Sequence, residues 1–163
     1  PWEAELRRRA RPHQLDPFLV AGLIRQESEY DHRAVSRAGA IGLMQIMPST
    51  GRDIFQRLGI PRFTTAKLRT PDISMRLGTF HLKQVIKEFD GSVELALAAY
   101  NAGSHRANTW ITWGEFEEPA EFVETSPFTE TRGYVQSVLR NRDMYQRLYG
   151  TGGGADVAVA AQD

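Results

Sequence analysis

The chain has 163 residues, and its 20 lysine and arginine residues balance its 20 aspartate and glutamate residues. This balance disfavours a strongly basic nucleic-acid binder, and no apolar run approaches the ~20 residues that a membrane-spanning helix needs. Hydrophobic residues make up 41% of the chain, enough to bury a core. The absence of cysteine excludes disulfides, thiol catalysis and thiolate metal sites.

The sequence predicts a mainly α protein, because helical patterns follow one another and strand alternation is confined to Leu43–Met47. Asp16-Pro17 is typical of a helix start, since aspartate caps a helix and proline suits its first position. Ser49, Ser92 and Thr129 are expected to cap later helices. The expected helices span residues 2–10, 16–29, 49–58, 70–89, 93–100, 107–113, 120–124 and 130–149. We expect one domain over residues 1–150 and a flexible glycine- and alanine-rich tail over residues 151–163.

Glu27 is the first candidate catalytic residue. At 3.6 residues per turn it shares a helix face with Val20, Leu23 and Ile24, which are apolar. A carboxyl group on such a face loses water, which raises its pKa and suits a general acid. The alternative is that Glu27 lies at the helix end and turns to solvent, and the pattern alone slightly favours this alternative.

Two further segments are candidates for ligand binding. Gln45 stands alone in an apolar run that follows the small residues Ala38–Gly42, where a backbone can approach a ligand closely. The alternative is a turn before a core strand, with Gln45 bonded to the backbone. Tyr100 and Asn101 end the most apolar helix and suit sugar recognition by stacking and hydrogen bonding. The alternative is a core tyrosine and an asparagine that caps the helix C-terminus.

The start of the last helix carries Glu130, with Tyr134 one turn later on the same face. Acidic residues are common at this position, because the helix dipole favours them. The four histidines (His13, His32, His81 and His105) are scattered, and none forms a paired zinc motif with a glutamate. We therefore expect neither a metal nor another cofactor.

Four motifs in order carry a resemblance to a known family. They are Gln26-Glu27-Ser28, Gly42-Leu43-Met44-Gln45-Ile46-Met47-Pro48, Ala99-Tyr100-Asn101-Ala102-Gly103, and the stretch from Pro127 to Val135. At these spacings the chain resembles the soluble lytic transglycosylase (SLT) catalytic domain of glycoside hydrolase family 23, which is related to goose-type lysozyme. The resemblance covers roughly residues 2–150 and implies a lysozyme-like α-helical domain with a groove for the glycan strands of bacterial peptidoglycan (murein).

The resemblance implies that Glu27 is the single catalytic acid and base. It would protonate the bond between N-acetylmuramic acid and N-acetylglucosamine and then accept the proton of the muramyl C6 hydroxyl, which closes onto C1. The product is a 1,6-anhydromuramyl end. By the same resemblance Ser36, Gln45, Met47, Tyr100 and Asn101 line the groove, and Glu130 and Tyr134 bind substrate near it.

The residues themselves agree with a mechanism that uses one carboxyl group. An ordinary glycosidase needs two carboxyl groups, ~5–5.5 Å apart for retention or ~6.5–9.5 Å apart for inversion. The sequence offers only Glu27 in an apolar setting, although Asp31 or Glu130 could fold close to it. A substrate that supplies its own nucleophile, such as the C6 hydroxyl, removes the need for a second carboxyl group.

Two alternatives to lytic cleavage stay open. One is plain hydrolysis, as in a goose-type muramidase, and the other is a module that binds peptidoglycan without cutting it. We expect a monomer in the bacterial periplasm or cell envelope whose partner is the glycan strand. We expect no nucleic-acid partner and no membrane span in this chain. Because the large soluble relatives carry a helical solenoid before this domain, the chain is expected to be a piece of a longer protein.

Overall fold

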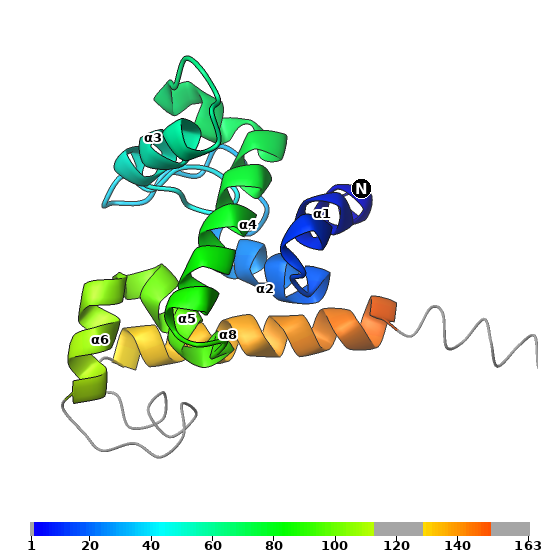
Figure 1. The fold of residues 1–163 in the computed structure, drawn as a ribbon. Coiled ribbons are helices and arrows are strands. Elements are labelled where there is room, and N and C mark those ends of the chain that lie inside the picture. Colours follow the sequence, from blue (N-terminus) through cyan, green and yellow to red (C-terminus); the bar gives the residue numbers. More distant parts are fainter. Residues whose placement is uncertain (1, 113–128, 151–163) are drawn as a thin grey trace, which may run out of the picture.

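The computed structural model describes residues 2–112 and 129–150. These residues form a mainly α fold, as the sequence predicts, and within them the backbone makes isolated bridges but no strand. The helices are α1 (Glu3–Ala10), α2 (Pro17–Ser28), α3 (Pro48–Arg57), α4 (Pro71–Glu88), α5 (Val93–Ala102), α6 (Ser104–Thr112) and α8 (Thr129–Tyr145) (Figure 1). Short 3-10 turns lie at Arg11–His13 and Thr65–Arg69, and a π turn lies at Gln146–Gly150.

Of the four predicted helix caps, Asp16 and Ser92 are confirmed and Ser49 is wrong, while Thr129 is itself the first residue of α8. The Asp16 carboxylate accepts a 2.8 Å hydrogen bond from the Phe18 amide, and the Ser92 hydroxyl accepts one of 3.3 Å from the Leu95 amide. Ser49 does not cap α3, because the helix begins one residue earlier at proline. The helix expected at 107–113 starts earlier, at residue 104. The helix expected at 120–124 and the tail at 151–163 lie outside the described residues.

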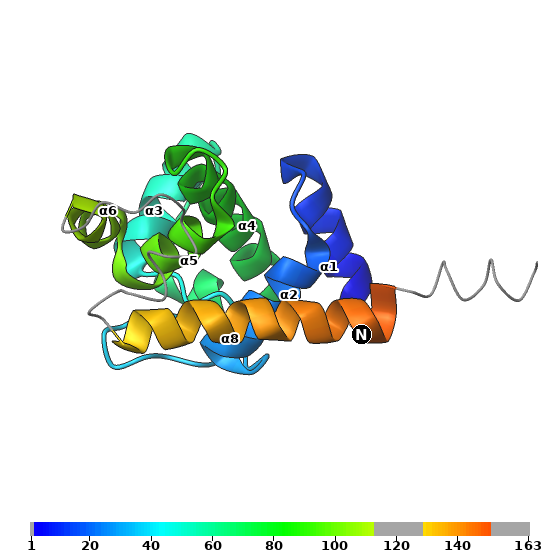
Figure 2. The same ribbon diagram turned by 90° about the horizontal axis from the view of Figure 1, so that it is seen from below.

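The long helix α8 lies along α2, and both views show the two side by side (Figures 1 and 2). Gly22 in the middle of α2 makes this close approach possible. A Cβ atom there would lie 2.8 Å from the Val138 carbonyl oxygen and 2.9 Å from the Arg142 amide nitrogen. Asn141 of α8 donates a 3.3 Å hydrogen bond to the Gly22 carbonyl oxygen. At Gly22 the backbone of α2 therefore lies directly against the backbone of α8.

The core lies where α4 and α5 meet the pair α2 and α8. Helix α5 packs against α4, α6 and α8, while α1 packs on α2 and α4. Large side chains from α2, the loop after it, α3 and α4 are completely buried here, among them Leu23, Met44, Phe55, Met75 and Leu82. None of the described helices combines the length and the apolar character that crossing a membrane requires.

The loop between α2 and α3 is pinned to both neighbouring helices. The Ser28 hydroxyl donates a 2.8 Å hydrogen bond to the Leu43 carbonyl oxygen, and the Met44 amide donates one of 3.1 Å to the Ser74 hydroxyl of α4. Gly42 has a φ of 85°, and a Cβ atom there would overlap the Leu68 carbonyl oxygen. These contacts thus hold the loop that carries Gln45 and Met47 in a fixed position on the core.

We predict that Gly22→Ala destabilises the fold by roughly 1–3 kcal/mol, the usual range for an overpacked contact. The added methyl group meets backbone atoms of α8, which cannot rotate away. Urea unfolding measures the effect. The matched control is Gly133→Ala in α8, where a Cβ atom meets nothing within 4 Å, so removal of a helical glycine is expected to be neutral or stabilising. Equal stability of the two variants would contradict the close contact.

Candidate active site

Glu27 lies in the last turn of α2, on the face predicted for it. Val20, Leu23 and Ile24 on that face are completely buried, and the Glu27 side chain is partly buried. Its Oε1 atom accepts a 2.7 Å hydrogen bond from the hydroxyl of Tyr134, a residue of α8 that is 6% exposed. The alternative in which Glu27 turns to solvent is therefore wrong.

Burial raises the pKa of Glu27 to about 7, from an ordinary value of 4.5. The hydrogen bond from Tyr134 acts in the opposite direction, because a donor favours the charged carboxylate. Burial has the larger effect. A carboxyl group with this pKa keeps its proton in about half of the molecules at neutral pH, and it can both donate and accept a proton there.

The two acids that the sequence left open as neighbours of Glu27 differ from it in their surroundings. Asp31 is exposed and accepts a 2.9 Å hydrogen bond from the Arg33 amide, which lowers the pKa of Asp31. Glu130 is exposed in the first turn of α8, where the helix dipole favours an acid. Within the described residues, neither forms a hydrogen bond to Glu27. Glu27 is the acid of the described chain that combines burial with a strongly raised pKa.

Tyr100 stands at the end of α5, within electrostatic reach of Glu27. Its hydroxyl donates a 2.7 Å hydrogen bond to the Met44 carbonyl oxygen, and its ring tilts against the ring of His81 at a centroid distance of 5.2 Å. Burial and the negative charge of Glu27 raise the pKa of Tyr100 well above its ordinary value. Tyr100 is thus a buried tyrosine, as the alternative from the sequence proposed, and it also forms part of the wall of the site.

Four of the predicted binding residues line one cavity of about 340 Å³: Gln45, Met47, Tyr100 and Asn101. His81 from α4 completes its wall beside Tyr100. Met47 is 39% exposed, which leaves its surface available to a ligand. The cavity joins an apolar surface to a few fixed polar groups, as sugar sites do.

Gln45 both bonds to the backbone and faces the cavity. Its Nε2 atom donates to the carbonyl oxygens of Ala34 and Gly42, at 3.2 Å and 3.0 Å. The backbone-bonded alternative is therefore confirmed for the amide nitrogen. Within the described residues the Oε1 atom forms no hydrogen bond, so it stays available as an acceptor for a ligand in the cavity.

Asn101 and Ser36 have different surroundings. The Asn101 Oδ1 atom accepts a 3.0 Å hydrogen bond from the Thr131 hydroxyl, which joins α5 to α8. The C-terminal cap of α5 is Gly103, so the alternative in which Asn101 caps this helix is wrong. Ser36 is exposed in a tight turn, where its hydroxyl accepts a 3.0 Å hydrogen bond from the Ala40 amide. Ser36 does not belong to the lining of the cavity beside Tyr100.

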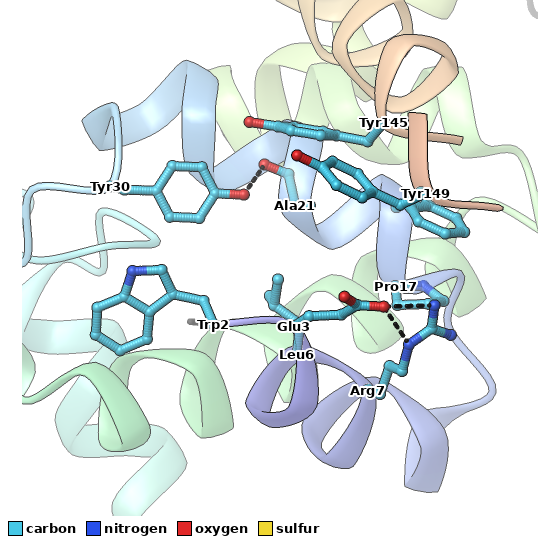
Figure 3. A pocket seen from close by; sticks show the side chains of 10 residues that line it. Trp2, Glu3, Leu6, Arg7, Pro17, Ala21, Tyr30, Tyr145 and Tyr149 are labelled. Carbon is cyan, nitrogen blue, oxygen red and sulfur yellow. Dashed lines mark hydrogen bonds and ion pairs between the residues drawn. The ribbon is translucent and has the colours of Figure 1, made fainter. Parts of the chain in front are cut away.

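A second cavity, of about 320 Å³, lies between α1, the start of α2 and the end of the chain's long helix (Figure 3). Tyr30, Tyr145 and Tyr149 form much of its wall. Its acidic residue, Glu3, is exposed and ion-paired with Arg7 at 3.0 Å. Glu27 belongs to the lining of neither cavity, but its charge acts on Tyr100 in the wall of the first one. The described residues also contain no cluster of three potential metal ligands.

Three residues of the site were not predicted from the sequence. Gly22 sets the approach of α8, Thr131 fixes Asn101, and His81 lines the cavity. A glycine inside an apolar helix is a signal for close packing and could have indicated Gly22. Thr131 and His81 lie far along the chain from the groups they contact, so no local pattern marks them.

Two profiles of known protein families match this chain. The family profile described as Transglycosylase SLT domain matches residues 6–122, which include Glu27 and the cavity residues. The profile described as Soluble lytic transglycosylase helical domain matches residues 125–153, which include Tyr134. A curated relative, the soluble lytic murein transglycosylase of Escherichia coli, is 39% identical over 139 residues, 83% of this chain and 21% of the relative. The chain thus spans about a fifth of the length of the curated relatives it matches.

Solved structures agree with the profiles. An inactive glutamate-to-glutamine mutant of the lytic transglycosylase Slt from Pseudomonas aeruginosa superposes with a TM-score of 0.84 and 39% identity, covering 90% of this chain and 24% of that one. The 70-kDa soluble lytic transglycosylase of Escherichia coli gives 0.84 and 33%, covering 92% and 25%. The profile match over most of the domain and the shared fold show that the chain belongs to the transglycosylase SLT domain family.

Proposed function

We propose that this chain is the catalytic domain of a lytic transglycosylase. It cleaves the β-1,4 bond between N-acetylmuramic acid and N-acetylglucosamine in peptidoglycan and leaves a 1,6-anhydromuramic acid end. The observation that carries this proposal is the partly buried carboxyl group of Glu27, whose pKa is raised and whose charge acts on Tyr100 in the wall of the cavity. The names of the relatives support it, as does the related enzyme that a glutamate-to-glutamine change makes inactive.

In the first step Glu27 donates its proton to the glycosidic oxygen. The bond between that oxygen and the muramyl C1 breaks, and N-acetylglucosamine leaves with a free O4 hydroxyl. Positive charge develops on C1 and the ring oxygen of the muramyl unit. In the second step the C6 hydroxyl oxygen bonds to C1, and its proton goes to the Glu27 carboxylate. Glu27 ends protonated as it began, and no water is consumed.

Tyr134 supports the charged form of Glu27 that exists between the two steps. Its hydroxyl donates to Oε1, which leaves Oε2 as the oxygen that carries the proton to and from the sugar. A hydrogen bond to a charged acceptor is stronger than one to a neutral acceptor. The hydrogen bond therefore strengthens as Glu27 loses its proton, so it stabilises the carboxylate that exists between the two steps.

A mechanism with one acid fits the described residues better than a mechanism with two. Retention or inversion through water needs a second carboxyl group at ~5–9.5 Å to act as a nucleophile or to activate water. Asp31 and Glu130 are both exposed, and the C6 hydroxyl of the substrate takes the part of the nucleophile. Ser36 and Glu130 would then contact the glycan strand outside the cavity.

The substrate determines where the chain acts. Peptidoglycan surrounds bacteria outside the cytoplasmic membrane, so we infer that the domain, residues 1–150, works in the periplasm or elsewhere in the cell envelope. We infer further that the domain acts as a monomer on the glycan strand.

The products released from purified peptidoglycan sacculi test this function by mass spectrometry. We expect muropeptides one water lighter than hydrolytic products, ending in anhydromuramic acid. Glu27→Gln is the matched control. Glutamine can still accept the hydrogen bond from Tyr134 but cannot donate a carboxyl proton, so we expect at least ~10²-fold slower cleavage with an unchanged melting temperature. Reducing-end products would show a hydrolase instead, and binding without any product would show a non-cleaving module.

The pH dependence of cleavage tests the contact between Tyr134 and Glu27. The acid must be protonated, so kcat/KM falls as pH rises through the pKa of Glu27. Tyr134→Phe removes a donor that lowers this pKa, so we expect the falling limb to move up by roughly one pH unit. Tyr30→Phe is the matched control, because it removes a tyrosine hydrogen bond to the Ala21 carbonyl oxygen instead. A limb that stays in place or moves down in Tyr134→Phe would contradict the assignment.

A further inference from the structure

His81 packs against Tyr100 of the candidate active site. It lies on α4, which packs against α5, and its ring meets the ring of Tyr100 at 5.2 Å with a tilt of 50°. The Tyr100 hydroxyl is itself tied to the Met44 carbonyl oxygen. The imidazole therefore rests on a side chain that cannot move freely.

His81 lines the cavity, and its ring nitrogens are not used by the described part of the protein around it. Within the described residues neither of them forms a hydrogen bond, and no buried side-chain nitrogen or oxygen is left without a partner. Both nitrogens must then reach open space, and His81 lines the cavity that also contains Gln45, Met47 and Asn101. A ligand in this cavity would meet a polar edge that the protein has left unbonded.

Burial lowers the pKa of His81, and the charge of Glu88 opposes this effect less strongly. The imidazole is therefore neutral at physiological pH, with one nitrogen that donates and one that accepts. A neutral donor and acceptor pair suits hydroxyl and acetamido groups, which also donate and accept. It does not suit a carboxylate or phosphate, for which a cation is preferred.

Three other polar side chains of the cavity are partly used within the protein. The Gln45 nitrogen is bonded to two backbone carbonyl oxygens, the Asn101 oxygen to Thr131, and the Tyr100 hydroxyl to Met44. Of these side chains, His81 keeps both of its polar atoms for a ligand. We propose that His81 is a substrate-binding residue, whose ring hydrogen-bonds a hydroxyl or acetamido group of the sugar beside Tyr100. This inference rests on the proposed function and adds a determinant of sugar specificity to it.

The test uses the Glu27→Gln chain, which holds substrate without turnover, and peptide-free glycan strands of alternating N-acetylglucosamine and N-acetylmuramic acid as the probe. Calorimetry gives the Kd. His81→Phe in this background keeps a ring against Tyr100 but loses both nitrogens, and we expect binding about tenfold weaker. His81→Gln restores a donor and an acceptor, and we expect it to recover most of the affinity.

His13→Phe is the matched control. The His13 ring packs edge-on against Phe80, next to His81 in α4, at 6.1 Å, and it does not line the cavity. We expect its Kd to equal that of the parent. In addition, ¹⁵N spectra of the imidazoles should show the His81 ring nitrogens shifting when strands are added, while those of His13 stay in place. A merely structural role for His81 would not produce this shift.

The inference and the proposed function can fail separately. If strands bind but His81→Phe changes the Kd less than twofold, or the His81 nitrogens do not shift, His81 is a packing residue and the inference is wrong. The unsubstituted chain can then still form anhydro products, and the proposed function stands. If the parent binds no strands, the inference is overturned, and product analysis of the unsubstituted chain decides whether the proposed function falls with it.

Discussion

The hydrogen bond between Tyr134 and Glu27 is the contact on which the site depends. It joins a carboxyl group at the end of α2 to a buried phenol of α8, and the same two helices approach each other closely at Gly22. Burial of Glu27 raises its pKa, and the hydrogen bond from Tyr134 lowers it less strongly. The packing of α8 on α2 therefore places Tyr134 beside the acid, and the burial of the acid determines how readily it keeps its proton.

The polar side chains of the cavity are also held in place, by hydrogen bonds within the protein. Gln45 adopts a positive φ of 51° and is tied to two backbone carbonyl oxygens, while Tyr100 is tied to one. The loop between α2 and α3 is pinned in turn by Ser28 and Ser74. Groups that are already oriented lose little conformational freedom on binding, which favours a precise position for the bond to be cleaved.

Local sequence patterns predicted the helices and the catalytic candidate. Asp16-Pro17 marked the start of α2 because capping is a property of adjacent residues, and Glu27 followed from the helical period. The same patterns slightly favoured a solvent-exposed Glu27, because its burial depends on α8. Tyr134 lies 107 residues away in the chain, and no periodicity pairs residues at that distance. The resemblance to the family supplied Tyr134, but its hydrogen bond to Glu27 and the role of Gly22 came only from the fold.

The most direct test of this account is the pKa of the Glu27 side chain itself. Titration of ¹³C-labelled glutamate carboxyl groups by NMR measures it, and the signal lost in Glu27→Gln assigns the resonance. We expect a midpoint at about 7. A midpoint near the ordinary value of 4.5 would mean that Glu27 is charged at neutral pH. Glu27 could not then be the group that protonates the glycosidic oxygen.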